Sequence, residues 1–567
     1  MAAAGFAGVS RIINTNFLIP TTIPITTIAT MTVKVALAQM NSIVGDLAGN
    51  HARIVDCSRL AFERGADIVL TPELSLVGYP PEDLLLRTVF YAKIQQTLAE
   101  LVFDLAQFKD LHVVIGLPIM ESGRRFNAAV VVQNGKVIGT YRKHDLPNTS
   151  VFDEKRYFSS GDQAFVFSVK NVQFGINICE DTWFPEAPAL ARQAGAQVLL
   201  VPNGSPYHMN KQHLRYQMMR QNVSAQGMSL VYANLVGGQD ELIFDGDSFV
   251  MDSAGKICAQ LSHFDTDMQV VEFDGATPLP LALPPALTVE AQVYRALVLG
   301  VRDYVQKNGF PSVLIGMSGG VDSALTLAIA VDALGCDKVR AVMMPSPYTA
   351  DISLIDSRDM VKRLDVRYDE IAIDGIFDVF LGALAHDFAG LPEDATEENI
   401  QARIRGTLLM ALSNKHGSIV LTTGNKSEMA VGYCTLYGDM AGGFAVIKDI
   451  AKTLVYRLCA YRNEVSNVIP ERILTRGPSA ELRADQLDQD TLPEYEVLDA
   501  IMQMYMEENR SVADIIEAGY AAADVTRVTR LIKINEYKRR QSPVGIRVTH
   551  RGFGRDWRYP ITSKFYE

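Results

Sequence analysis

A glycine-rich turn in the second half of the chain holds residues suited to binding a phosphate group. The apolar run Val313–Ile315 predicts a buried strand, and GMSGGVDS (Gly316–Ser323) follows it directly. Apolar residues then recur with a helical period as far as Val331. A turn between a strand and a helix directs backbone N–H groups and the positive end of the helix at one point, which favours an anion. Asp322 adds a carboxylate that would hold a cation beside that anion.

A second glycine-containing turn, TTGNKSE at residues 422–428, has a similar setting. It follows the strand-like run Ser418–Leu421 and precedes a helical pattern. A site that binds several phosphate groups needs a cation such as Mg²⁺, and this ion prefers oxygen ligands from carboxylates and phosphates. Asp322 and Glu428 are therefore the predicted metal ligands. Taken alone, Glu428 would fit equally well as a carboxylate that complements the dipole of the following helix.

A glutamate, a lysine and a cysteine in the first half of the chain lie in short stretches that each follow a strand-like run. They are Glu73, Lys143 and Cys179. In such a set a thiolate attacks an amide carbon, a carboxylate transfers protons, and an ammonium offsets the charge that develops on oxygen. Each residue alone has a simpler explanation, as a packed cysteine, a solvated lysine or a carboxylate at a helix start. Together they indicate amide hydrolysis.

The elements that position this set alternate between strand-like runs and helical patterns from Val33 to about Phe273, which predicts a mixed α/β domain. Helical patterns fall at residues 49–64 and 212–226. The predicted strands are VKVALAQ (33–39), DIVLT (67–71), HVVIGL (112–117), NAAVVVQ (127–133), Phe174–Ile178, QVLLVP (197–202) and SLVYANLV (229–236).

A proline-rich stretch, GATPLPLALPP at residues 275–285, has four prolines among eleven residues and predicts a stiff connector between two domains. Beyond it, predicted strands at 339–344, 368–373 and 418–422 alternate with helical patterns, which is typical of a parallel, doubly wound sheet. The domains expected are therefore residues 31–274 and 287–567, joined by a linker at 275–286. The tail of the second domain is expected to be helical and then irregular.

The first thirty residues contain no acidic side chain, and Pro20 and Pro24 would interrupt a helix. We interpret residues 1–30 as a disordered extension, or as the product of an upstream start codon, rather than as a targeting segment.

The composition restricts the class of protein. A net charge of −12 argues against nucleic acid as the main partner, because it implies no broad basic face. Six scattered cysteines without a C-x-x-C pair suit a reducing compartment, and they argue against disulfides or a zinc site. No apolar run is long enough to span a bilayer. We therefore expect a cytoplasmic protein that acts on small molecules and has no nucleic-acid or membrane partner.

The turn SGGVDS resembles the phosphate-binding loop of the ATP-pyrophosphatase family and lacks the lysine of a Walker P-loop. Together with TTGNKSE, GPSAEL (477–482) and NEYKRRQSP (535–543), it resembles the NAD⁺ synthetase branch of that family. The resemblance implies an adenine nucleotide α hydrolase-like fold and a site for deamido-NAD⁺ at Asn399, Glu428 and Lys538. It also implies ATP contacts from Gly316, Met317, Ser318, Gly319, Gly320, Val321, Asp322, Ser323 and Thr423.

The set Glu73, Lys143 and Cys179 resembles the catalytic triad of the nitrilase (carbon–nitrogen hydrolase) superfamily. The stretch LPNTSVFDEKRYF (146–158) is similar to one that marks the glutaminase domains of glutamine-dependent NAD⁺ synthetases. This resemblance implies an α-β-β-α sandwich, with Cys179 as nucleophile, Glu73 as base and Lys143 as partner of the oxyanion. It also implies an additional carboxylate, Glu154, and glutamine contacts from Thr149, Ser205 and Lys211; the family commonly has tyrosine at the first of these three positions.

The combination of the two halves predicts one reaction. We expect ATP-dependent amidation of deamido-NAD⁺ to NAD⁺, with ammonia released from glutamine and with glutamate, AMP and pyrophosphate as further products. The cofactor expected is Mg²⁺, and the resemblance implies a homo-oligomer. One alternative is an amidotransferase of the same design acting on another carboxylate, which GPSAEL and NEYKRRQSP argue against. The other is a non-catalytic nucleotide sensor, which the intact triad and SGGVDS argue against.

Overall fold

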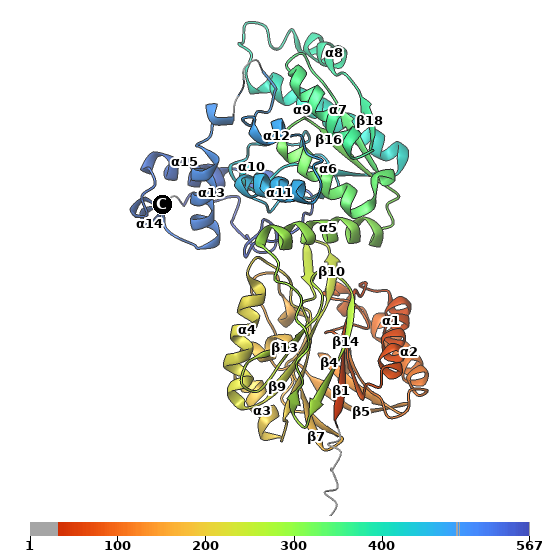
Figure 1. Ribbon diagram of the computed structural model, residues 1–567. Helices are drawn as coiled ribbons and strands as arrows, with labels where there is room; N and C mark the ends of the chain where they lie inside the picture. The colour runs from red at the N-terminus through yellow and green to blue at the C-terminus, as the bar shows by residue number, and fades with distance from the viewer. Residues whose placement is uncertain (1–31, 484–485, 487, 566–567) are drawn as a thin grey trace, which may run out of the picture.

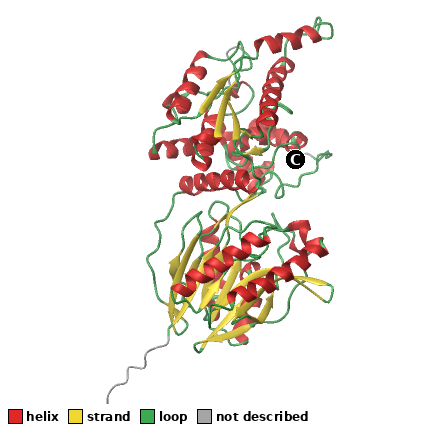
Figure 2. Ribbon diagram, turned by 90° about the vertical axis from the view of Figure 1, so that its right-hand side faces the viewer, coloured by secondary structure: helices red, strands yellow, loops and turns green. Residues whose placement is uncertain are grey.

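The computed structural model of the protein describes residues 32–483, 486 and 488–565, so the predicted extension at residues 1–30 lies outside the described residues. Two α/β bodies are stacked along the long axis of the molecule, and helix α5 (Val289–Lys307) lies across the junction between them (Figures 1 and 2). Among the described helices, none combines the length and the apolar character needed to cross a membrane.

The N-terminal body consists of two sheets packed face to face. One apolar cluster lies between the two sheets. A second cluster packs one sheet against helices α1 and α2, and a third packs the other sheet against helices α3 and α4. This arrangement is an α-β-β-α sandwich, as predicted. The seven-stranded sheet has the order β15 (Thr277–Pro278), β14 (Asp267–Asp274), β1 (Val33–Gln39), β2 (Ile68–Leu70), β3 (His112–Glu121), β4 (Arg124–Gln133) and β5 (Lys136–Arg142).

The second sheet of this body has six strands, and a separate hairpin projects toward the other body. The sheet has the order β13 (Ile257–Gln260), β12 (Phe249–Met251), β9 (Ser229–Asn234), β8 (Val198–Asn203), β7 (Val172–Ile176) and β6 (Val166–Val169). The hairpin is β10 (Val236–Gln239) and β11 (Leu242–Asp245), and the helices are α1 (Leu47–Glu63), α2 (Thr88–Leu105), α3 (Glu186–Gln193) and α4 (Lys211–Asn222).

Strand β1 illustrates why the central strands are continuous apolar runs. Val33, Val35 and Leu37 face the cluster between the sheets, whereas Ala36 and Ala38 face the helices. Both faces are therefore buried, as is usual for parallel strands covered on both sides. β1, β2 and β3 are parallel, β5 has the same direction, and β7, β8 and β9 are parallel in the other sheet. Loops that follow these strands thus gather at the carboxyl ends of the strands.

The C-terminal body contains a five-stranded sheet in which every neighbouring pair is parallel. Its first strand in sequence is central, and helices cover both faces, so the sheet is doubly wound as predicted. The strand order is β18 (Arg367–Glu370), β17 (Val339–Met343), β16 (Val313–Met317), β19 (Ile419–Thr422) and β20 (Phe444–Ala445).

The helices of this body form three groups. α6 (Val321–Leu334), α7 (Asp351–Arg363), α11 (Lys452–Val465) and α12 (Glu471–Thr475) share an apolar cluster with α5 on one face of the sheet, and α8 (Asp374–Leu384) and α9 (Ala395–His416) cover the other. A satellite cluster at the side contains α10 (Lys426–Val431), α13 (Tyr495–Met502), α14 (Val512–Glu517) and α15 (Ala522–Ile534), followed in the chain by α16 (Glu536–Arg539).

The proline-rich connector is more closely attached to the first body than the sequence suggested. Thr277–Pro278 forms β15 and pairs with β14, and the backbone N–H of Leu281 donates to the carbonyl of Cys258 at 2.7 Å. Proline is tolerated there because β15 is an edge strand, and on its outer side no neighbouring strand needs a backbone N–H donor. The chain becomes helical at α5, where the Thr288 hydroxyl caps the helix by accepting from the N–H of Ala291.

Candidate active sites

The first candidate site lies where loops from both sheets of the N-terminal body meet. Glu73 follows β2, Lys143 follows β5, Cys179 follows β7 and Gly204 follows β8. The Lys143 ammonium donates to Glu73 Oε1 at 2.7 Å, and the Gly204 N–H donates to Glu73 Oε2 at 2.8 Å. The Asn127 amide donates a further hydrogen bond of 2.7 Å to Glu73 Oε1. Glu73 is fully buried, so these bonds fix its orientation.

The buried Lys143 is shared by two carboxylates. Its ammonium donates to both oxygens of Glu154 at 3.0 Å, and the Tyr79 hydroxyl donates to Glu154 Oε1 at 2.9 Å. Burial would lower the pKa of Lys143, but Glu154 and Glu73 raise it well above its ordinary value. Burial also raises the pKa of Glu154 to about 7, although Lys143 favours its ionised form. The lysine therefore keeps its positive charge throughout the neutral range.

Cys179 begins a short 3₁₀ turn, Cys179–Trp183, shortly after strand β7 ends. Its backbone φ is +47°. A positive φ is unusual for a residue with a Cβ and is found at functional sites where the surroundings enforce it. Burial, and then the charge of Glu73, raise the pKa of the Cys179 thiol well above its ordinary value, whereas Lys143 lowers it. The thiol is thus protonated at neutral pH, and a base must remove its proton before it can attack.

The three residues predicted to contact glutamine have different surroundings. Ser205 is buried, and its N–H donates to Asn234 Oδ1 at 2.9 Å. The Lys211 ammonium lies 4.1 Å from the centre of the Trp183 ring, which brings it to the turn that starts at Cys179. Burial, together with the charge of Arg215, lowers the pKa of Lys211 to about 8. Thr149 is exposed in a surface loop, so the structure does not bring its side chain into the buried cluster.

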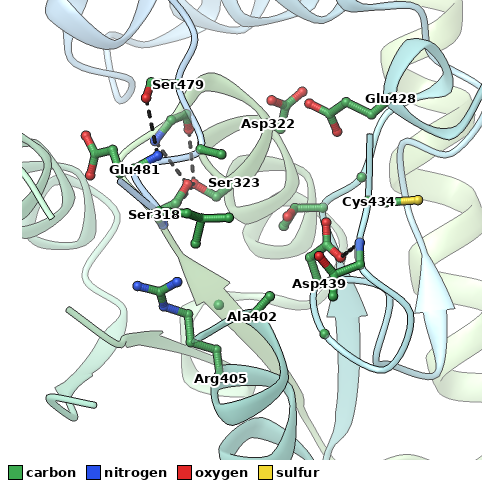
Figure 3. A pocket seen from close by; sticks show the side chains of 18 of the residues that line it. Ser318, Asp322, Ser323, Ala402, Arg405, Glu428, Cys434, Asp439, Ser479 and Glu481 are labelled. Carbon is green, nitrogen blue, oxygen red and sulfur yellow. Dashed lines mark hydrogen bonds between the residues drawn. The ribbon is translucent and has the colours of Figure 1, made fainter. Parts of the chain in front are cut away.

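The second candidate site is a cavity of about 490 Å³ in the C-terminal body (Figure 3). Every residue predicted to contact ATP or deamido-NAD⁺ lines it: all of Gly316–Ser323, Thr423, Asn399, Glu428 and Lys538. Residues 316–323, Thr423 and Glu428 share the cavity because β16 and β19 are neighbours whose carboxyl ends lie together. Asn399 reaches it from α9 and Lys538 from α16.

The SGGVDS turn has the expected strand–turn–helix geometry between β16 and α6. Gly319 has a φ of +78°, and a Cβ at this position would lie 2.7 Å from the carbonyl oxygen of Ser353. The Ser323 hydroxyl donates to the carbonyl of Gly320 at 3.0 Å, and the Gly320 N–H donates to Ser318 Oγ at 3.2 Å. The turn is held by its own hydroxyls at the N-terminus of α6, where an anion is favoured.

Two carboxylates face each other at one end of the cavity, and a lysine connects them. Asp322 and Glu428 lie side by side in Figure 3. The Lys452 ammonium donates to Asp322 Oδ2 at 2.5 Å and to Glu428 Oε1 at 3.3 Å, and Asn425 Nδ2 donates to Asp322 Oδ1 at 2.9 Å. Burial raises the pKa of Glu428 to about 8, against the influence of Lys452. In the described part of the chain no third metal-binding side chain joins them. A pair of carboxylates fits a hard cation that also takes phosphate oxygens and water as ligands.

The residues assigned to deamido-NAD⁺ also make contacts within the protein. Asn399 Oδ1 accepts from the Thr435 hydroxyl at 2.7 Å, and the Lys538 ammonium donates to the carbonyls of Gly432 and Cys434, each at 2.8 Å. Lys538 therefore fixes the loop after α10 and lies at the cavity wall.

Sequence reasoning missed several polar residues of this cavity. Lys452 begins a helical pattern, which is typical of a solvated lysine, so no sequence signal distinguishes it. Arg405 lies on α9 and donates to the carbonyl of Met344 at 2.9 Å, and burial lowers its pKa to about 10. Glu481, within the recognised stretch GPSAEL, accepts from the Ser353 hydroxyl at 2.6 Å.

Comparison with known proteins identifies both bodies. Residues 34–277 match the family model "Carbon-nitrogen hydrolase", and residues 293–542 match "NAD synthase". A glutamine-dependent NAD(+) synthetase of Acinetobacter baylyi is 48% identical, with 94% of this chain and 98% of the relative covered. The chain belongs to the glutamine-dependent NAD⁺ synthetases.

Other relatives agree. A glutamine-dependent NAD(+) synthetase of Thermotoga maritima is 43% identical over 94% of this chain and 99% of its own length. The solved structure of the glutamine-dependent NAD⁺ synthetase from Acinetobacter baumannii, in complex with ADP, matches with a TM-score of 0.76 and 46% identity, covering 94% of this chain and 98% of that one. As a glutamine-dependent NAD⁺ synthetase, the protein is a glutamine-hydrolysing ligase that uses ATP to make NAD⁺, and the two alternative functions are not favoured.

Proposed function

We propose that the N-terminal site releases ammonia from glutamine and that the cavity of the C-terminal body uses this ammonia to amidate deamido-NAD⁺. The observation that carries the proposal is the pairing of a buried Glu–Lys–Cys set in one body with a complete SGGVDS turn and facing carboxylates in the other. The domain assignment proposed is 31–274 for the glutaminase and 287–567 for the synthetase.

In the glutaminase half, Glu73 takes the proton of the Cys179 thiol as the sulfur attacks the side-chain amide carbon of glutamine. The Lys143 ammonium stabilises the negative charge that develops on the amide oxygen. Glu73 returns the proton to the leaving nitrogen, and ammonia departs. Water activated by the same carboxylate then hydrolyses the thioester to glutamate. Ser205 and Lys211 bind the substrate, with the ammonium of Lys211 suited to the α-carboxylate; Thr149 is the third proposed contact.

In the synthetase half, the carboxylate of deamido-NAD⁺ attacks the α-phosphate of ATP, pyrophosphate leaves, and ammonia displaces AMP from the adenylate. The residues Gly316–Ser323 and Thr423 bind ATP, with the turn N–H groups and Lys452 offsetting phosphate charge. Asn399, Glu428 and Lys538 bind deamido-NAD⁺, with Lys538 near its reacting end.

The divalent ion proposed for this half is Mg²⁺, held by Asp322 and Glu428. When bound with ATP, the ion neutralises phosphate charge as pyrophosphate departs. Asp322 and Glu428 lie side by side and would supply two oxygen ligands, and phosphate oxygens of the substrate would supply others.

Ammonia must travel between the sites in its neutral form, because ammonium has no lone pair with which to attack. This requirement favours an enclosed passage across the junction of the two bodies. All six cysteines are unpaired, which supports a reducing compartment, and we propose that the enzyme acts in the cytoplasm as a homo-oligomer.

The test is NAD⁺ formation from deamido-NAD⁺ and Mg-ATP, with either glutamine or ammonium as nitrogen donor, while AMP and ADP are followed. We expect NAD⁺ with stoichiometric AMP from both donors. If neither donor gives NAD⁺ while glutamine is still hydrolysed to glutamate, the proposed acceptor is refuted. If ADP forms in place of AMP, the adenylate route is refuted.

A further inference from the structure

A buried carboxylate outside the catalytic set connects two of its loops. Asp181 has no exposed surface, and each of its oxygens accepts two hydrogen bonds. Oδ1 accepts from the backbone N–H groups of His144 at 2.9 Å and Asp145 at 2.7 Å. Oδ2 accepts from the N–H of Ile178 at 2.8 Å and from the Tyr141 hydroxyl at 2.7 Å.

These four donors belong to the two segments that carry catalytic groups. His144 and Asp145 come directly after Lys143, and Tyr141 precedes it on β5. Ile178 precedes Cys179, and Asp181 itself lies in the same 3₁₀ turn as the thiol. One side chain thus joins the loop that supplies the ammonium to the turn that supplies the nucleophile. The strands β5 and β7 belong to different sheets, so no ladder of backbone hydrogen bonds makes this connection.

We propose that Asp181 is a positioning residue of the glutaminase reaction: it fixes the Cys179 thiol relative to the Lys143 ammonium. The inference rests on the proposed roles of Cys179 and Lys143. This role explains how the unfavourable φ of Cys179 is maintained. The Asp181 carboxylate lies in the turn after Cys179 and accepts from the N–H of Ile178 before it, so it fixes the backbone on both sides of the cysteine.

The role requires a carboxylate rather than an amide. All four partners are donors, and an ionised carboxylate is the side chain that presents acceptors alone. An asparagine would face two of these donors with its own N–H₂ group and would lose their bonds. Burial raises the pKa of Asp181 to about 6, even though the backbone N–H groups and the Tyr141 hydroxyl favour its charged form.

The test compares Asp181→Asn with the wild type in the full-length enzyme, using both nitrogen donors. We expect kcat for the glutamine-dependent reaction to fall roughly 100-fold, as for a misplacement of about 1 Å. The KM for glutamine should change less than about threefold, because Ser205 and Lys211 make no bond to Asp181. Ammonia-dependent NAD⁺ formation should stay within about twofold of wild type. The Tyr141→Phe variant removes one donor of four and should give a smaller fall of the same kind.

The matched control is Asp252→Asn. Asp252 accepts from the backbone N–H groups of Ala254 and Lys256, each at 2.9 Å, in the β12–β13 hairpin at the opposite end of the sheet. We expect this variant to keep its glutamine-dependent kcat. An equal loss in both variants, or a raised KM with unchanged kcat in Asp181→Asn, would overturn the positioning role. Absence of glutamine-dependent activity in the wild type would instead refute the proposed function itself.

Discussion

The charge of Lys143 depends on the two carboxylates that share it. An ammonium with no exposed surface would lose its proton unless opposite charges were in contact, and Glu73 and Glu154 supply them at 2.7 and 3.0 Å. Burial, and then the charge of Glu73, raise the pKa of the neighbouring Cys179 thiol, whereas Lys143 lowers it. The site therefore keeps the thiol neutral at rest, and in the proposed mechanism Glu73 takes its proton only as the sulfur attacks the amide carbon.

Replacing the nucleophile separates the two reactions. We expect Cys179→Ala to lose glutamine-dependent NAD⁺ formation by at least about 1,000-fold, since no other group can form the thioester. Ammonia-dependent NAD⁺ formation should remain within about twofold, because the synthetase cavity contains no residue of the first site. Initial rates with each donor measure both effects. Loss of both activities would contradict the two-site arrangement.

The pKa of Lys211 predicts how glutamine use depends on pH. Burial lowers this pKa to about 8, so the side chain is a cation below pH 8 and loses its charge above it. We therefore expect kcat/KM for glutamine to fall as pH rises beyond 8, by up to about tenfold per pH unit.

The control for this alkaline limb is Lys211→Arg, because a guanidinium stays charged in this range. The decline should disappear or move to higher pH in that variant. Ammonia-dependent synthesis at the same pH values serves as an internal reference. The same decline in both proteins would show that another group is responsible.

The residues that sequence reasoning found follow strand-like runs, but this position alone does not identify every functional residue, because the missed Asp181 follows the same run as Cys179. Glu73, Cys179 and Asp322 follow apolar runs closely, and the end of a strand is where an α/β fold presents chemical groups. Lys452 and Asp181 act through contacts with residues far away in the chain or on another sheet. Their neighbours in sequence give no periodicity or spacing that predicts such contacts.

At the scale of elements, the turn from β16 to α6 depends on the backbone of Gly319. The backbone at this position has a positive φ, which costs a residue with a side chain about 1–2 kcal/mol. The added Cβ would also lie only 2.7–2.8 Å from backbone atoms of Ser353. We expect Gly319→Ala to reduce NAD⁺ formation at least about tenfold with either donor, because the displaced turn no longer fits phosphate. Glutamate release from glutamine should persist.

The control is Gly335→Ala, at the other end of α6. Gly335 has a φ of +85°, but no atom lies within 4 Å of a Cβ built there. With a ψ of +152°, Gly335 lies in a backbone region that residues with a Cβ avoid, so this variant carries a conformational cost without the overlap. Its thermal stability should fall while its synthetase activity stays near wild type. Equal activity losses in the two variants would mean that the phosphate turn has no special role.

The sequence predicted the buried apolar strands well. It did not predict exposed, polar strands or the pairing of strands that are far apart in the chain. The sequence VKVALAQ predicts β1 with its observed bounds, because both of its faces are buried. Lys136–Arg142 is largely exposed and has few apolar residues, so β5 gave no signal although Lys143 follows it. β14 pairs with β1 across more than 200 residues of sequence, and no local pattern contains that information. Strand partners thus come from tertiary packing rather than from periodicity.

At the scale of the whole molecule, the two bodies are joined by buried polar contacts around α5. Asp303 on this helix accepts from Asn41 Nδ2 and from the Gly238 N–H, both at 2.8 Å and both in the N-terminal body. Lys307, one turn later, donates to the carbonyl of Gly238 at 2.8 Å. A Cβ at Gly238 would lie 3.2 Å from Gly300, so helix and hairpin touch at the backbone. The two bodies are thus in close contact at this junction, which suits the proposed transfer of ammonia between the sites.

Removing Asp303 should therefore loosen the junction while leaving each site intact. Asp303→Ala deprives two donors of their acceptor and leaves Lys307 without its carboxylate partner at 3.4 Å, a cost on the order of 3 kcal/mol. We expect glutamate released per NAD⁺ formed to rise at least about twofold, because ammonia escapes at the junction, while ammonia-dependent kcat changes little. Asp369→Ala is the comparison, since Asp369 on β18 pairs with Arg340 on β17 at 2.6 Å, inside the C-terminal body and away from α5. It should lower thermal stability without changing the ratio. If both variants change the ratio alike, general destabilisation explains the leak; if neither does, α5 does not seal the route that ammonia takes.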